Sequence, residues 1–228
     1  MARADEAEYG RHPGWPARLG PLVTPAGHVV LRPPRLRDAA AWSSIRLRDR
    51  AHLEDWEPSG FGDWSDRNAA LAWPAQWYAL RALARRGHAL PFVITVNDEF
   101  AGQITIGNVV RGALRSAWLG YWVSSAMTRG GIATAAAALV VDHAFGPGGL
   151  HRVEATVRPE NNASLRVLAK LGFRQEGVYR RYLDVAGSWR DHLALALTVE
   201  DTPGGLVNHL IREGLAWPPS ARLSGGGR

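Results

Sequence analysis

The chain has 228 residues, of which 46% are hydrophobic and 21% are charged, so it is long enough to bury the core of one or two globular domains. It contains no cysteine, which excludes disulfides, thiolate metal sites and cysteine nucleophiles and is typical of a cytoplasmic protein. The sequence contains no run of 18 apolar residues, so no membrane span is predicted. The first twenty residues also lack the apolar region of a secretory signal.

Basic residues outnumber acidic residues by 27 to 21, which gives a formal net charge of +6. They form no run of five or more, and Lys170 is the only lysine among them. A nucleic-acid-binding domain would need a clustered basic surface. We therefore expect no specific nucleic-acid binding, and the spacing of acids and histidines predicts no metal site.

The first part of the chain is interrupted by prolines and turns. Residues 1–26 contain four prolines and are expected to be a poorly ordered leader. A short strand is predicted at 29–31, and Asp38 is a suitable N-cap for a helix that runs to about residue 48. After a turn rich in Gly, Ser and Pro, apolar residues at helical spacing predict a helix over 68–86, which Pro74 would kink or divide.

The rest of the chain alternates between strand and helix patterns. The predicted strands lie at 91–96, 100–109, 118–123, 152–157, 174–183 and 188–198, and the predicted helices at 133–144 and 161–171. This order predicts one mixed α/β domain over residues 27–200. Residues 201–228 are expected to hold a short helix that packs on the domain, followed by a disordered, Gly-rich tail.

The turn after the strand at 118–123 is the most informative segment. Gly130 and Gly131 remove side chains from this turn, and the first turn of the following helix has free N–H groups and a partial positive charge. Such a turn can bind a pyrophosphate, although a glycine pair can also merely ease the change from strand to helix. The motifs of P-loops and of nicotinamide-binding folds are both absent, so the ligand must be of another kind.

Several segments occur here in a characteristic order: LGYWV (119–123), RGGIAT (129–134), VVDHAF (140–145), HRVEATVRPENNAS (151–164), VLAKLGFRQEGVYR (167–180) and WRDHLALALT (189–198). Together they resemble the GNAT N-acetyltransferases, most of all the RimJ/RimL type of ribosomal-protein N-terminal acetyltransferases. The resemblance implies a single GNAT-like domain. Its mostly antiparallel sheet would splay between its two central strands, be flanked by helices and bind acetyl-CoA in the opening.

Carried over to this chain, the resemblance implies a set of residues that bind CoA. Backbone groups of Tyr121, Trp122 and Val123 would face the pantetheine arm, and Asn161 would contact the same arm. The pyrophosphate would lie on the loop formed by Arg129, Gly130, Gly131, Ile132, Ala133 and Thr134. The family loop begins with glutamine or arginine where this chain has Thr128, so we expect a weakened affinity for CoA, with Arg129 supplying the missing charge.

Two residues are candidates for catalysis. Ser164 would lie near the sulfur and act as the general acid for the leaving thiolate, but at the third position of a helix that Asn161 caps it is also an ordinary helix-start residue. Glu154 lies on the polar face of a strand that should be central, where a charge needs a reason. It would position or deprotonate the amine, or alternatively form an ion pair with Arg152 or Arg158.

The chain contains ten tryptophans, several of them in the region that forms the acceptor side in this family. The helical spacing of Trp73 and Trp77 favours packing in the core. Trp56 and Trp64, in the turn rich in Gly, Ser and Pro, are the better candidates for contact with an acceptor.

These observations predict an acetyl-CoA-dependent N-acetyltransferase that acts on the N-terminal α-amine of a protein, for which the resemblance implies a ribosomal protein. An α-amine has a pKa near 8 and lysine one near 10.4, so an enzyme without an obvious strong base suits an N-terminus better. The alternatives are an acetyltransferase for small amines, such as aminoglycosides or polyamines, and an acyl-CoA-binding regulator without turnover. The enzyme is expected to be a monomer or homodimer without membrane attachment.

Overall fold

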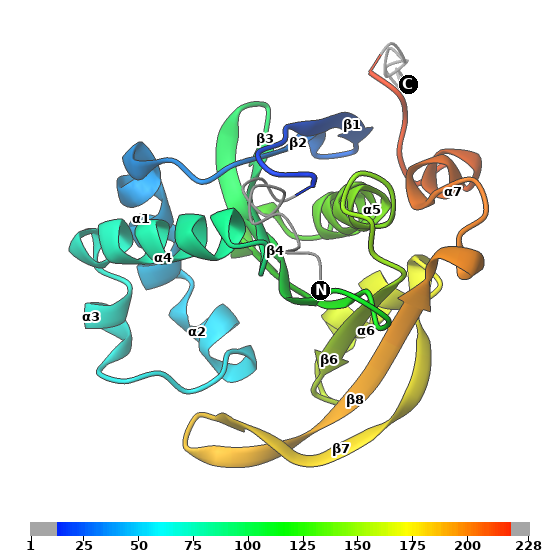
Figure 1. The fold of residues 1–228 in the computed structure, drawn as a ribbon. Coiled ribbons are helices and arrows are strands. Elements are labelled where there is room, and N and C mark those ends of the chain that lie inside the picture. The colour runs from blue at the N-terminus through cyan, green and yellow to red at the C-terminus, as the bar shows by residue number, and fades with distance from the viewer. Residues whose placement is uncertain (1–12, 220–228) are drawn as a thin grey trace, which may run out of the picture.

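The computed structural model describes residues 13–219, which form one eight-stranded sheet in the order β1-β2-β3-β4-β5-β6-β8-β7 (Figure 1). The strands are β1 (Leu19–Thr24), β2 (Gly27–Arg32), β3 (Leu90–Val96), β4 (Glu99–Val110), β5 (Ser116–Val123), β6 (Arg152–Val157), β7 (Arg174–Val185) and β8 (Ser188–Thr198). Neighbouring strands are antiparallel except β5 and β6, which are parallel. The predicted mixed and mostly antiparallel α/β fold is confirmed.

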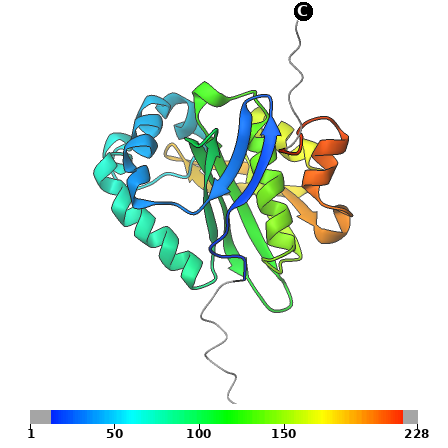
Figure 2. The same cartoon turned by 90° about the horizontal axis from the view of Figure 1, so that it is seen from above.

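Helices cover both faces of the sheet (Figure 2). Helix α5 (Ile132–Phe145) packs on one face and is buried around most of its circumference, because its alanines allow close approach to the strands. Helices α1 (Ala39–Arg48) and α4 (Trp73–Arg85) lie on the other face, and α6 (Asn162–Lys170) follows β6. Two shorter helices, α2 (Arg50–Leu53) and α3 (Trp64–Arg67), lie between α1 and α4.

The prediction that residues 1–26 form a poorly ordered leader is wrong for residues 19–24. These residues form β1, which pairs with β2, and the register shifts between Leu19 and Leu22. An edge strand with such an irregularity can accommodate Pro21, because a missing backbone donor there costs no interior ladder bond. The domain therefore begins before the predicted boundary at residue 27, and residues 1–12 lie outside the described chain.

Asp38 precedes α1, but its side chain does not cap that helix. The carboxylate instead forms two hydrogen bonds with the guanidinium of Arg32, at 2.9 and 2.7 Å, and accepts another from the backbone N–H of Arg35. The paired bonds between a carboxylate and a buried arginine are stronger than the single bond of a helix cap. The position of the helix is confirmed, but the predicted role of Asp38 is not.

Pro74 does not kink the helix predicted over 68–86. It lies in the first turn of α4, where a missing N–H leaves no bond unmade, and a short 3-10 turn over Ala70–Ala72 precedes it. The helix is therefore shorter than the apolar pattern predicts, because the first residues of that pattern belong to separate turns.

The C-terminal segment packs on the domain as predicted. Helix α7 (Leu206–Arg212) buries Leu206 and Leu210 and lies against α5, whose Asp142 accepts hydrogen bonds from the first backbone amides of α7. Trp217 pairs with Val23 of β1. Residues 220–228, expected to be disordered, lie outside the described chain.

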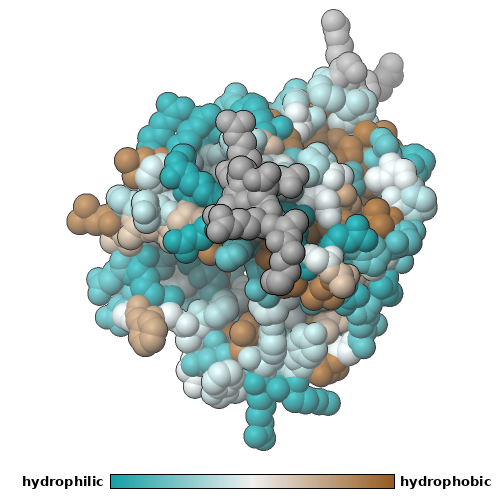
Figure 3. Space-filling model, in the orientation of Figure 1, coloured by the Kyte–Doolittle hydropathy of each residue, from teal (hydrophilic) through white to brown (hydrophobic). Residues whose placement is uncertain are grey.

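The surface in Figure 3 is mostly hydrophilic, with hydrophobic residues exposed in separate places. Among residues 13–219, no helix is long and apolar enough to cross a membrane. The same residues contain no group of three or more histidine, aspartate or glutamate side chains arranged to hold a metal ion.

Candidate active site

The two central strands pair over only three residues before they separate. The pairing joins Ser116–Trp118 of β5 to Arg152–Glu154 of β6, after which β6 continues to pair with β8 alone. The remainder of β5 therefore has no partner on its β6 side. A cavity of about 810 Å³ lies in this opening, a volume within the range of ligand pockets in enzymes. The predicted splay between the central strands is confirmed.

Both edges of the opening line the cavity. Leu119–Val123 of β5 lie on one side, and Ala155–Arg158 lie on the other. Tyr121, Trp122 and Val123 belong to this edge. Because backbone groups alternate sides along a strand, those that point away from β4 are unpaired at the edge of β5. An extended ligand with amide groups can form strand-like hydrogen bonds with such an edge.

The loop after β5 leads directly to the N-terminus of α5, and Thr128 and Ala133 at its two ends line the cavity. Arg129 and Gly131 have positive φ angles of 67° and 78°, which turn the chain into the helix. The first amides of α5 have no acceptor within the helix and carry its partial positive charge. This end of the cavity therefore suits an anion.

The two glycines of the loop serve different purposes. A Cβ atom on Gly130 would lie 2.5 Å from the Cβ of Ala26, in the turn between β1 and β2, so no side chain fits there. Gly131 has only ordinary contacts around such an atom, and its positive φ is what favours glycine. Gly130 thus permits packing against the turn that follows β1, whereas Gly131 sets the backbone of the helix start.

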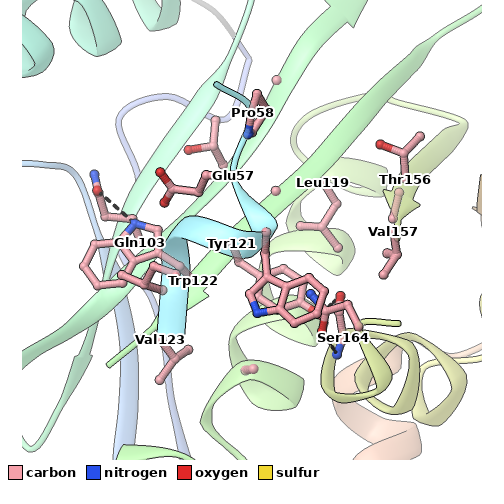
Figure 4. Close-up of a pocket in the computed structure, with 18 of the residues that line it drawn as sticks. Glu57, Pro58, Gln103, Leu119, Tyr121, Trp122, Val123, Thr156, Val157 and Ser164 are labelled. Atoms are coloured by element: carbon pink, nitrogen blue, oxygen red, sulfur yellow. Dashed lines mark hydrogen bonds between the residues drawn. The ribbon is translucent and has the colours of Figure 1, made fainter. Parts of the chain in front are cut away.

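Asn161 caps α6, because its side-chain oxygen accepts a hydrogen bond from the backbone N–H of Ser164 at 3.0 Å. Both residues also line the cavity. The hydroxyl of Ser164 lies 2.9 Å from the hydroxyl of Tyr121 (Figure 4). Burial raises the pKa of Tyr121 to about 12, so this pair of hydroxyls stays protonated at neutral pH. The sequence assigned only the backbone of Tyr121 to the site and missed its side chain.

Glu154 is not among the residues that line the cavity. Its carboxylate accepts a hydrogen bond from Nε of Arg152 at 2.7 Å, and Arg152 also binds Glu176. The ion pair with Arg152 is therefore the arrangement that the structure adopts, one of the two alternatives that the sequence left open.

The other side of the cavity is built around Arg46 of α1. The Arg46 guanidinium binds both carboxylate oxygens of Glu57, and its Nε donates to the side-chain oxygen of Asn68. It also lies 4.8 Å from the ring centre of Trp64 and 5.4 Å from that of Trp122. Figure 4 shows Glu57 on the opposite side of the cavity from Ser164, with Tyr121 between them.

Trp56 and Trp64 have different positions. Trp56 lines the cavity and is 37% exposed, and the guanidinium of Arg158 lies over its ring. Trp64 is buried beneath Arg46 and donates from its indole N–H to the Arg46 carbonyl. The predicted contact with an acceptor is thus possible for Trp56 and wrong for Trp64, because Arg46 covers its ring.

Asp49 connects the two sides of the site. Located just after α1, it accepts hydrogen bonds of 2.7 Å from both the backbone N–H and the hydroxyl of Ser125, in the loop after β5. Burial alone would raise the pKa of Asp49, but the bonds from Arg48 and Ser125 outweigh burial and hold the pKa well below its usual range. Arg48 also donates to Ser124, so two residues join α1 to this loop.

Comparison with known proteins gives the site a family context. Residues 28–174 match the model of the acetyltransferase (GNAT) domain. The structure of Mycobacterium smegmatis RimJ in complex with CoA-disulfide is 58% identical, with a TM-score of 0.90 over 91% of this chain and 99% of that one. The ribosomal protein uS5 alanine N-acetyltransferase of Escherichia coli (strain K12) is 31% identical over 77% of this chain and 91% of its own length.

A third relative matches over a shorter stretch. The probable N-acetyltransferase YjcK of Bacillus subtilis is 43% identical over 105 residues, which is 46% of this chain and 58% of that protein. The opening beside β5 provides a strand edge that suits the amide groups of the pantetheine arm of CoA. The helix start at its end provides a turn that suits the pyrophosphate. The chain therefore belongs to the GNAT family, as a RimJ-like N-acetyltransferase that uses acetyl-CoA.

Proposed function

We propose that this enzyme acetylates the N-terminal α-amine of a ribosomal protein. The observation that carries the proposal is the likeness to RimJ over 99% of that chain, together with the relative named for the alanine of ribosomal protein uS5. In the proposed reaction, the neutral amine attacks the carbonyl carbon of the thioester. The new bond is C–N and the C–S bond breaks. The amine loses one proton, and the departing thiolate takes up one proton, so that CoA leaves as the free thiol.

We assign the binding of acetyl-CoA to residues along β5 and the helix start. The backbone groups of Tyr121, Trp122 and Val123 would pair with the pantetheine arm, and the side chain of Asn161 would adjoin it. The amides from Arg129 to Thr134 would surround the pyrophosphate. Thr128 stands where the family loop begins with glutamine or arginine, so these amides would provide most of the attraction.

The Tyr121–Ser164 pair is our candidate for the group that stabilises the departing thiolate. The two hydroxyls lie 2.9 Å apart, and the pKa of Tyr121 is about 12. A hydroxyl with so high a pKa remains protonated and can donate a hydrogen bond to a sulfur anion. The proposal gives Glu154 no step, because Arg152 holds its carboxylate and it does not line the cavity.

An α-amine as acceptor agrees with this chemistry. At neutral pH about a tenth of such an amine is already neutral, against less than a thousandth of a lysine side chain. The enzyme then needs to orient the amine and the thioester more than it needs a strong base.

Mass spectrometry of acceptors incubated with acetyl-CoA tests the proposal. The mixture would contain ten-residue peptides that begin with alanine and carry one internal lysine, each with a free or a blocked N-terminus, together with polyamines. We expect a gain of one acetyl group on the free N-termini only. A gain on polyamines alone would contradict the proposed acceptor and indicate a small amine instead. A gain on blocked peptides would indicate that the enzyme acetylates lysine side chains.

A further inference from the structure

Glu57 is a carboxylate in the cavity to which the proposed reaction gives no task. It lines the cavity together with Tyr121 and Ser164, and its side chain is 28% exposed. A charged group beside a mostly apolar cavity wall is costly unless it is paired or used. Arg46 pairs with it, and that arginine is itself only 8% exposed.

The position of Glu57 is fixed from two sides. The Arg46 guanidinium is held by Asn68 and by the flanking indole rings, so it has little freedom to move. Two residues after Glu57, the backbone N–H of Ser59 donates to the carbonyl of Asp184 at 2.8 Å, and the Ser59 hydroxyl accepts from the N–H of Gly187. The segment that carries Glu57 is thus tied both to α1 and to the turn between β7 and β8.

Its pairing with Arg46 leaves the carboxylate able to accept more hydrogen bonds. An ionised carboxylate accepts about four, and Arg46 occupies one site on each oxygen. An ammonium group has three N–H donors. When a substrate peptide brings this group into the cavity, the donors need oxygen atoms that can accept hydrogen bonds. Gln103, whose side-chain oxygen accepts from Trp42 and Trp122, lies in the same cavity but carries no charge.

We infer that Glu57 binds the α-ammonium group of the acceptor and selects acceptors that have one. The inference rests on the proposed function and adds the residue that recognises the N-terminus. Arg46 acts as a positioning residue, which holds the carboxylate in place. The group bound is a primary ammonium at the end of an extended peptide, and it must lose its proton before it attacks the thioester.

Steady-state kinetics of Glu57→Gln tests this inference with two peptides. One is a ten-residue peptide that begins with alanine, and the other is its des-amino analogue, which lacks only the α-amine and serves as a competitive inhibitor. We expect the KM of the first peptide to rise about ten- to a hundredfold, which is the range for a lost hydrogen bond to a charged group. The Ki of the analogue and the KM of acetyl-CoA should stay within about twofold.

Glu54→Gln is the matched control. Glu54 belongs to the same segment, but it pairs with Arg50 and does not line the cavity. The Glu54→Gln variant should leave the KM of the peptide, the Ki of the analogue and the KM of acetyl-CoA unchanged. If Glu57→Gln fails to fold or to bind acetyl-CoA, Glu57→Asp replaces it, for which we expect the same pattern with a smaller rise.

An unchanged peptide KM in Glu57→Gln would overturn the inference while the proposed function stands. A parallel rise of KM and Ki would overturn it too, because a merely structural role weakens both peptides alike. Failure of the wild-type enzyme to acetylate any N-terminus would remove the proposed function and this inference with it.

Discussion

Two parts of the site are built in different ways. The β5–α6 part (residues 116–170) is one continuous stretch in which backbone groups, a helix start and a helix cap form the binding surface. The α1–α4 part (residues 39–85) relies on side chains from separate elements, joined through Arg46, Glu57 and Asn68. The first part has the groups that a cosubstrate common to the whole family requires. In the proposed reaction, the second would contact the acceptor.

Replacement of Arg46 should give the largest difference between the two parts, because it damages the α1–α4 part and leaves the β5–α6 part intact. Arg46→Ala removes a buried guanidinium and leaves Glu57 and Asn68 without their partner. We expect a loss of about 3 kcal/mol in the free energy of unfolding, the lower end for a broken buried pair because Glu57 reaches solvent. Urea denaturation measures the loss, and calorimetry should find the affinity for acetyl-CoA unchanged within about twofold.

Arg50→Ala is the control for this change. Arg50 pairs with Glu54 on the exposed surface of the same region, and such pairs contribute little. A comparable loss of stability in the control would mean that Arg46 has no special part in the site.

The hydroxyl pair tests the chemistry within the β5–α6 part. Tyr121→Phe and Ser164→Ala each remove one hydroxyl of the contact at 2.9 Å. We expect kcat to fall about a hundredfold in each variant, the lower end of the range for removing one donor to a developing negative charge. The affinity for CoA, measured by calorimetry, should change little. Full turnover in both variants would contradict our assignment of the thiolate site.

Asp49 tests the connection between the two parts. Asp49→Asn keeps the size of the side chain but loses the charge that accepts from Ser125 and Arg48. We expect a loss of about 1–3 kcal/mol at pH 7. Because the folded-state pKa of Asp49 is lowered, its contribution is complete above the unfolded pKa of about 3.9 and declines as pH falls further.

Denaturation of both proteins at pH 7, 5 and 3 measures this decline. The difference in stability between wild type and Asp49→Asn should be similar at pH 7 and 5 and smaller at pH 3. A difference that grows towards pH 3 would have the opposite sign and would rule out a stabilising, ionised Asp49.

The smallest expected effect concerns the anion-binding turn. Ala133 lies in the first turn of α5 and faces the cavity. Ala133→Glu should weaken the binding of CoA about tenfold through charge repulsion, whereas Ala133→Gln, of nearly the same shape, should weaken it much less. Calorimetry at low and high salt compares the two. An equal loss of CoA affinity in the two variants would show that the size of the new side chain, and not its charge, weakens binding at this turn.

The difference between the two parts also explains what the sequence could predict. The helix and strand patterns from residue 116 to 198 are local, and the predicted elements agree closely with β5 to β8 and the helices between them. The cap by Asn161 depends on a residue only three positions away, and it is confirmed.

Contacts between distant residues were not predictable in this way. β1 was missed because Pro21 within it and Pro25 after it indicate a break, and an edge position in the sheet overrides that signal. Asp38 binds Arg32 and not its own helix. Glu57 is one acid in a turn, and nothing local connects it to Arg46 or connects Ser59 to Asp184.

The most direct test of the proposed reaction uses one peptide that carries both kinds of amine. A ten-residue peptide that begins with alanine and contains one lysine would be incubated with acetyl-CoA between pH 6 and 9, and fragmentation mass spectrometry would locate the acetyl group. We expect it on the α-amine at every pH, at a rate that reaches about half of its maximum near pH 8 and levels off towards pH 9 as the amine loses its proton. Acetylation of the lysine in preference to the N-terminus would contradict the account.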